Sequence, residues 1–146
     1  MTPTIRQPTP GDVPRLHALI RDHAAFERST ASLTAEALEA LLRETAIRFL
    51  VAEGDGELQG YAAVTFDWSV WRARRYAHLD CLFVAEIHRG RGIGRWLLSR
   101  ARELASSEGV DRMEWQTPAW NEDACRFYVR EGASCESKAR FSLALP

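Results

Sequence analysis

The sequence predicts a mixed α/β fold in which one sheet packs against helices, and three observations lead to that prediction. Runs rich in β-branched and aromatic residues at 47–52, 58–66 and 76–84 predict strands. Before and after those runs, apolar residues repeat at steps of three and four, as on amphipathic helices. The order strand, helix, strand over residues 76–117 implies a parallel, right-handed crossover. The 146 residues suffice for one core, so we expect a single domain over 1–146.

The N-terminal third predicts a short strand followed by two helices. Residues 4–6 are the edge strand, and Thr9-Pro10-Gly11-Asp12 is a helix start with proline at the first helical position. An apolar face then continues through about Ala25. A second helix is expected to start at Thr34 and to turn its leucines toward the core.

The middle of the chain predicts an antiparallel hairpin and a central strand. Residues 53–57 are the turn between strands 47–52 and 58–66, and residues 67–72 form a loop carrying two tryptophans. Residues 76–84 follow as the third strand. Because residues 81–84 are continuously apolar, we expect that stretch to be buried on both faces.

The C-terminal part predicts two helices and two strands. A helix begins after the glycine-rich residues 88–95 and ends near Gly109, which suits a left-handed cap. Residues 112–117 are a strand, Asn121 caps a last helix that Gly132 closes, and residues 141–145 supply a final strand.

Composition argues against several classes of function. The net charge of −1 does not suggest a broad surface for nucleic acid or membrane. The three cysteines lack C-x-x-C spacing, so we expect them to be reduced thiols. The four histidines lack metal-ligand spacing, so no metal is expected and they receive no role. Without a signal peptide or a bilayer-length apolar run, we expect a cytoplasmic protein.

Residues 88–95, His-Arg-Gly-Arg-Gly-Ile-Gly-Arg, lie between the central strand and the next helix. A helix leaves its first N–H groups without intrahelical partners, and glycine lets the chain approach a bulky ligand, so this turn predicts a phosphate or pyrophosphate site. The absence of any Gly-Lys pair excludes a P-loop. A dinucleotide-binding turn and a purely structural turn are the alternatives. The G-x-G-x-G spacing disfavours the first, and the interleaved arginines disfavour the second.

Residues 89–94 resemble the Q/R-x-x-G-x-G/A signature of the GNAT superfamily of acetyl-CoA-dependent N-acetyltransferases. Its second signature is matched by residues 121–122, 127–128 and 131–133. Within the superfamily, the chain is most similar to the diamine (spermidine/spermine) acetyltransferase branch, in residues 5–6, 26–27, 79–80, 82–84, 120–122 and 127–128. The resemblance implies a mixed, mostly antiparallel sheet that is splayed in the middle and flanked by about four helices.

By this resemblance acetyl-CoA is the co-substrate, and its pyrophosphate lies on the glycine turn. The pantetheine arm follows the end of the central strand, where an N–H near Leu82 faces the thioester carbonyl and stabilises the oxyanion. Asn121 holds an amide of the arm, with an ordinary N-cap role equally open. The implied cofactor-binding residues are Leu82, Phe83, Val84, Arg89, Gly90, Arg91, Gly92, Ile93, Gly94, Arg95, Asn121 and Ala124.

Direct transfer to an amine needs a base, because an ammonium has no lone pair, and an acid, because a thiolate leaves. Tyr128 matches the tyrosine that the family places near the sulfur and is the expected acid. Asp80 interrupts an apolar strand and is the expected base, directly or through a water, with a structural role as the alternative. In the diamine branch Leu79-Asp80-Cys81 corresponds to Leu-Glu-Asp.

The acceptor is expected to be a small cationic amine such as a polyamine, diamine or lysine-like compound. Anionic and aromatic side chains suit it by ion pairing and cation–π contact, and Asp67, Trp68 and Trp71 are candidates for the entrance. An aminoglycoside, amino acid or protein amine is an alternative acceptor, and a non-catalytic acyl-CoA-binding module is an alternative of another class. The family often forms homodimers. The expected acceptor-binding residues are Phe26, Glu27, Asp80, Glu114, Trp115 and Gln116.

Overall fold

The computed structural model describes residues 2–146, which fall into two compact units, Met1–Gln116 and Thr117–Pro146. The first unit contains β1 (Thr4–Arg6), the short 3-10 helix η1 (Pro10–Asp12), α1 (Val13–Phe26), α2 (Ala35–Leu41), β2 (Ile47–Gly54), β3 (Glu57–Ser69), β4 (Arg74–Val84), the 3-10 helix η2 (Glu86–His88), α3 (Ile93–Ser107) and β5 (Met113–Glu114). The second contains α4 (Glu122–Arg130). That residues 1–146 form one domain stays a prediction.

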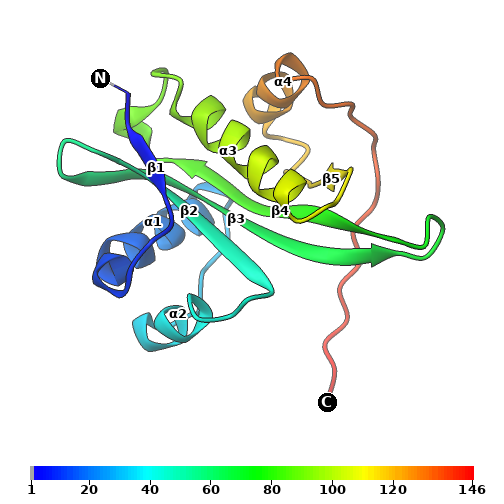
Figure 1. The fold of residues 1–146 in the computed structure, drawn as a ribbon, viewed down its shortest axis with the longest axis horizontal. Helices are drawn as coiled ribbons and strands as arrows, with labels where there is room; N and C mark the ends of the chain where they lie inside the picture. Colours follow the sequence, from blue (N-terminus) through cyan, green and yellow to red (C-terminus); the bar gives the residue numbers. More distant parts are fainter. Residues whose placement is uncertain (1) are drawn as a thin grey trace. The chain divides into compact units, whose positions relative to one another are not determined.

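The first unit is built on a five-stranded sheet in the order β1-β2-β3-β4-β5. Each neighbouring pair is antiparallel except β4 and β5, which are parallel. Helices α1 and α2 cover one face of this sheet, and α3 covers the other (Figure 1). The prediction of a mixed, mostly antiparallel sheet flanked by helices is therefore confirmed.

Both faces of the sheet are packed, because alternation along each strand sends side chains to opposite sides. On the α1 face, Leu16 and Leu38 pack with Val51, Tyr61 and Phe83 in one buried cluster. The intervening residues of β2 and β3 are buried outside that cluster and meet the apolar side of α3. That second group contains Leu50, Ala52, Ala62, Val64, Leu97 and Ala101.

The N-terminal elements start and end close to their predicted positions. Thr34 caps α2 by accepting a hydrogen bond from the Ala37 N–H at 3.1 Å. Asp12 is the acid at the third position after Thr9, and its carboxylate accepts from the Thr9 N–H at 2.7 Å. Local capping chemistry therefore positions both helices.

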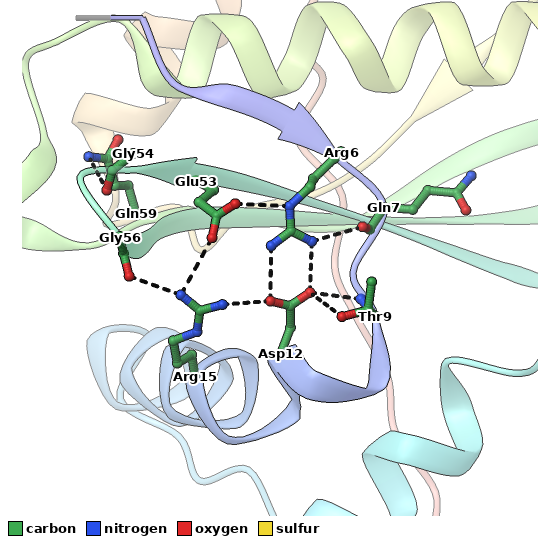
Figure 2. Close-up of polar contacts among 9 residues, drawn as sticks. All are labelled: Arg6, Gln7, Thr9, Asp12, Arg15, Glu53, Gly54, Gly56 and Gln59. Carbon is green, nitrogen blue, oxygen red and sulfur yellow. Dashed lines mark hydrogen bonds and ion pairs between the residues drawn. The ribbon is translucent and has the colours of Figure 1, made fainter.

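Asp12 is also the centre of an ion-pair network that joins β1 to α1 (Figure 2). Its carboxylate, whose residue is only 2% exposed, accepts from Arg6 at 2.7 and 3.0 Å and from Arg15 at 2.7 Å. Arg6 also donates to Glu53 on β2 at 3.1 Å. Hydrogen bonding from Arg6 holds the pKa of Asp12 well below its ordinary value of 3.8.

Replacing Asp12 with asparagine is expected to lower the free energy of unfolding by about 3 kcal/mol at neutral pH, because it removes the buried anion between two guanidinium groups. A depressed folded pKa adds stability above the unfolded pKa, and this contribution is lost as pH falls through the folded pKa. The difference between wild type and Asp12→Asn should therefore shrink below about pH 4. Urea denaturation at neutral and acid pH measures it. Asp22→Asn on the exposed side of α1 is the control, and equal losses for both variants would contradict the role of Asp12.

Three predicted segments differ in the structure. The prediction of a loop at residues 67–72 is wrong, because β3 continues to Ser69 and β4 begins at Arg74. Asp67 and Trp68 pair with Tyr76 and Arg75 inside a long hairpin. The 112–117 strand shortens to β5, which pairs with β4 at two positions only. Residues 141–145 are not a strand: Phe141, Leu143 and Leu145 are exposed, and an alternating pattern makes a strand only where a neighbour pairs with it.

Candidate active site

The second half of β4 has an open edge. β5 pairs with β4 only at Ala77 and His78, so from Leu79 to Val84 the described residues provide a hydrogen-bonded strand, β3, on one side alone. The Ala85 N–H donates to the Gln59 carbonyl of β3 at 2.9 Å. Since successive residues of a strand point their polar groups to opposite edges, the N–H and carbonyl of Leu82 face the open side. This is the splayed sheet that the sequence predicted.

The predicted burial of 81–84 on both faces is wrong. Phe83 is buried, but Cys81, Leu82 and Val84 are only half-buried. The reason is that β5 pairs with β4 only as far as His78, so among the described strands none covers the outer edge of residues 81–84. The apolar run therefore lines an accessible edge.

Asp80 is the extra residue of a β-bulge. Ala63 pairs with Cys81 and Val64 pairs with Leu79, so Asp80 has no partner in β3. Its side chain is 52% exposed, with one carboxylate oxygen 3.5 Å from the Cys81 Sγ and the other 3.8 Å from the His78 Nδ1. Bulges re-aim side chains, and this one turns a carboxylate out of an apolar strand beside the open edge.

The glycine-rich turn connects that edge to α3. Gly92 is the N-cap of α3 with φ of 83° and no side-chain cap, and Gly90 has φ of 77°. A Cβ atom at Gly90 would have nothing within 4 Å, and one at Gly92 would meet only the Trp96 ring, at 3.7 Å. The first N–H groups of α3 thus stand at an uncapped helix end with room in front, which fits an anionic group such as a pyrophosphate.

The Arg89 side chain binds the end of β4. Its Nε donates to the Val84 carbonyl at 2.9 Å, and its guanidinium carbon lies 4.6 Å from the Phe26 ring centroid and 5.3 Å from that of Phe83. This cation–π contact brings the end of α1 to the end of β4. Arg91 and Arg95 on the same turn are exposed.

Glu27, at the end of α1, belongs to a hydrogen-bonded group with His23 and Tyr61 that the sequence did not predict. His23 contacts the Glu27 carboxylate through Nε2 at 2.8 Å and the Tyr61 hydroxyl through Nδ1 at 2.6 Å. The His23 ring stacks on Phe83 with 5.0 Å between centroids. The only local signal was the four-residue spacing of His23 and Glu27 on one helix face, since Tyr61 joins them through tertiary packing.

Cys81 continues this group toward Asp80. The Cys81 thiol donates to the Asp80 carboxylate at 3.5 Å, and the residue packs against the buried cluster that contains Tyr61. Burial raises the pKa of Cys81 to about 12, so it is a neutral thiol at physiological pH. A thiol is a weak nucleophile, and this disfavours an acetyl-cysteine intermediate at Cys81.

The remaining predicted acceptor residues lie on and after β5. Glu114 pairs with His78 in the sheet, and its carboxylate accepts from the Arg112 Nε at 2.6 Å. Trp115 is half-buried and Gln116 is exposed. The negative charge of Glu114 is thus already partly compensated by Arg112, which lies just before β5.

In the second unit, Asn121 caps α4, where its Oδ1 accepts from the Ala124 N–H at 3.2 Å. The N-cap prediction is confirmed, and the cofactor role of Asn121 stays a prediction. Tyr128 is half-buried, with its ring 5.2 Å from that of Phe127. Ala124 and Tyr128 are one helical turn apart and share a face of α4.

Among residues 2–146, no three or more histidine, cysteine, aspartate or glutamate side chains are grouped so as to hold a metal ion. Over the same residues, no helix is long and apolar enough to cross a membrane.

Comparison with known proteins adds three findings. A thialysine N-epsilon-acetyltransferase of Caenorhabditis elegans is 30% identical over 122 residues, which cover 82% of this chain and 76% of the relative. The human spermidine/spermine N(1)-acetyltransferase-like protein 1 is 26% identical over 88% of this chain and 20% of its own. The crystal structure of an aminoglycoside acetyltransferase from a soil metagenomic sample, in complex with trehalose, matches the fold with a TM-score of 0.83 and 20% identity, over 98% of this chain and 96% of that one.

The family model for the acetyltransferase (GNAT) family matches residues 13–133, which extend from the start of α1 to beyond the end of α4. The match contains the open edge of β4 and the glycine-rich turn. Together with the diamine-type relatives, it shows that this chain belongs to the GNAT family of N-acetyltransferases, on its diamine acetyltransferase-like branch.

Proposed function

We propose that this N-acetyltransferase moves the acetyl group of acetyl-CoA directly to a primary amine of a small cationic molecule, such as a polyamine, a diamine or a lysine-like compound. The observation that carries the proposal is the continuity of the open β4 edge with the uncapped start of α3. An extended thioester arm and its anionic end group require such an arrangement.

The residues of the turn and of the open edge fit acetyl-CoA. The N–H groups of Gly92, Ile93 and Gly94 would hold the pyrophosphate, and the outward polar groups of Leu82 would pair with the arm. Arg91 and Arg95 would add positive charge. Bound acetyl-CoA supplies an activated acetyl thioester, and the Leu82 N–H would stabilise negative charge on its carbonyl oxygen.

Two side chains would handle protons. Asp80 would take the proton of the ammonium, directly or through a water, and the bulge that exposes its carboxylate supports this role. Tyr128 would donate a proton to the leaving thiolate, and its support is the match to the family motif. The neutral thiol of Cys81 supports direct transfer over a cysteine intermediate.

A cationic acceptor is supported by the acids near the open edge. Glu27 contacts His23, which contacts Tyr61, and Asp80 contacts Cys81, which packs against the buried cluster that contains Tyr61. The Phe26 ring lies at the end of the helix that carries Glu27. The thialysine acetyltransferase relative is named for an ε-amine, which agrees with a lysine-like acceptor. An amine panel read by CoA release tests this: turnover of diamines, polyamines or lysine analogues is expected, and turnover of aminoglycosides or α-amines alone would overturn it.

Tyr128→Phe is expected to reduce turnover by at least about tenfold, because removing a general acid costs that much or more. The affinity for acetyl-CoA should change little, since the ring is retained. Steady-state CoA release and calorimetric titration with acetyl-CoA measure the two quantities. Tyr76→Phe on β4 is the control for loss of a hydroxyl, and unaltered turnover in Tyr128→Phe would remove Tyr128 from the acid role.

Homodimer formation and a cytoplasmic location stay predictions. Sedimentation velocity tests the first, and subcellular fractionation tests the second.

A further inference from the structure

Glu27 occupies an unfavourable place for a carboxylate. It is the residue that ends α1, its N–H bonds back to the His23 and Ala25 carbonyls, and Arg28 follows with φ of 61°. The C-terminal end of a helix carries partial negative charge and therefore disfavours an anion. The side chain is nevertheless only one-third exposed, and its carboxylate is held by His23.

His23 is held more firmly than the residue it contacts. Its side chain is 14% exposed, its ring stacks on Phe83, and its Nδ1 meets the hydroxyl of Tyr61 at 2.6 Å. Tyr61 is 1% exposed and lies in the core between α1 and the sheet. The imidazole therefore has a fixed position, and the glutamate at the rim takes its orientation from it.

The partners of His23 also determine which ring nitrogen carries hydrogen. An ionised carboxylate only accepts hydrogen bonds, so Nε2 must donate to Glu27. Burial raises the pKa of Tyr61 far above its ordinary value, so the hydroxyl keeps its proton and donates to Nδ1 of the neutral ring. Tyr61 and Glu27 together select the Nε2-protonated tautomer.

We propose that His23 is a positioning residue for the acceptor amine, which orients the Glu27 carboxylate so that its second oxygen receives the cationic end of the substrate. His23 uses Oε2 of Glu27, and Oε1 is left to accept from an ammonium. His23 contacts Tyr61 and Phe83 of the buried cluster, and Cys81, which donates to Asp80, packs against the same cluster, so both acids are held against one buried framework. This inference rests on the proposed function, because it assumes acetyl transfer to a cationic amine.

A pair of substitutions separates the two sides of the imidazole. The amide nitrogen of glutamine reaches the place of Nε2, so His23→Gln keeps a donor to Glu27 and loses the contact with Tyr61. Asparagine reaches only the place of Nδ1, so His23→Asn keeps a partner for Tyr61 and releases Glu27. We expect His23→Asn to raise the KM of the amine about tenfold, the cost of losing one oriented charged hydrogen bond, with kcat and the KM of acetyl-CoA nearly unchanged. His23→Gln should restore most of the amine KM.

Glu27→Gln extends the test without disturbing the core. It should raise the amine KM as His23→Asn does, and the double variant should be no worse than either single one, because both remove the same interaction. Equal KM values for His23→Asn and His23→Gln, or additive effects in the double variant, would overturn the proposal. So would a fall in kcat with the amine KM unchanged.

A spectroscopic measurement needs no turnover. Nitrogen-15 NMR of the His23 ring at about pH 8, where imidazoles are ordinarily neutral, is expected to show hydrogen on Nε2. Hydrogen on Nδ1 would overturn the proposal even in an active enzyme. A wild-type protein that acetylates no amine would overturn the proposed function and this inference together, whereas an active enzyme with an unchanged amine KM in His23→Asn would overturn this inference alone.

Discussion

Gly92→Val is expected to weaken acetyl-CoA binding at least about a hundredfold, because a side chain at the start of α3 would stand where the pyrophosphate must meet the backbone N–H groups. The protein itself has room for it, since a Cβ at Gly92 would meet only Trp96, at 3.7 Å. The fold should survive with a loss of about 1–3 kcal/mol for a β-branched residue at positive φ. A bulky residue at Gly94 should have the same effect on binding.

Gly109→Val is the matched control for this prediction. Gly109 has φ of 81°, nearly that of Gly92, and a Cβ there would meet nothing within 4 Å. Because the two φ angles are similar, the backbone strain from valine should be comparable at both positions. Gly109 lies just beyond the other end of α3, so its substitution leaves the glycine-rich turn unchanged. Calorimetric titration with acetyl-CoA and urea denaturation of both variants separate binding from stability. Near-normal acetyl-CoA affinity in Gly92→Val would contradict the assignment of the turn.

Gly60→Ala is expected to destabilise the protein by about 3 kcal/mol, at the upper end of the cost of forcing extra volume into a packed core. An added Cβ would lie 2.6 Å from the Phe83 carbonyl oxygen and 3.3 Å from the Val84 Cα. These are backbone atoms of the neighbouring strand, so relief requires β3 and β4 to separate. The separation would displace the end of β4, whose other side is the open edge, and acetyl-CoA binding should fall as well.

Thermal and urea denaturation measure the effect of Gly60→Ala. Gly11→Ala is the control, because its Cβ would make an ordinary contact of 3.7 Å with the Thr9 hydroxyl. Equal stability of Gly60→Ala and wild type would show that the two strands tolerate the added methyl group.

Local signals in the sequence predicted a large part of the fold. The cap at Thr34, the cap at Asn121 and the glycine start of α3 depend on residues within four positions of one another, so they are readable along the chain. The hairpin of β2 and β3 was likewise predicted from its turn.

Features that depend on contacts between residues far apart in the sequence could not be predicted from it. The bulge at Asp80 is defined by Ala63 and Val64 on another strand, and the contact of His23 with Tyr61 requires α1 to dock on the sheet. The strand predicted for residues 141–145 failed for the related reason that alternation specifies a face and not a neighbour. Asp80 itself was singled out because a carboxylate in an apolar run is conspicuous without knowledge of the pairing.

Across the bulge, the odd-numbered side chains of β4 change from one face of the sheet to the other. Before it, Ala77 and Leu79 are buried outside the α1 cluster, whereas after it Phe83 belongs to that cluster and Cys81 packs against it, although all four positions are odd-numbered. Deletion of Asp80 would make Leu79 and Cys81 neighbours in a regular ladder, in which every remaining side chain keeps the face of the sheet that it occupies now. Relatives should therefore be aligned through β4 by the face that each residue occupies, since a gapless count across the bulge would equate an acid at the open edge with a residue of the core.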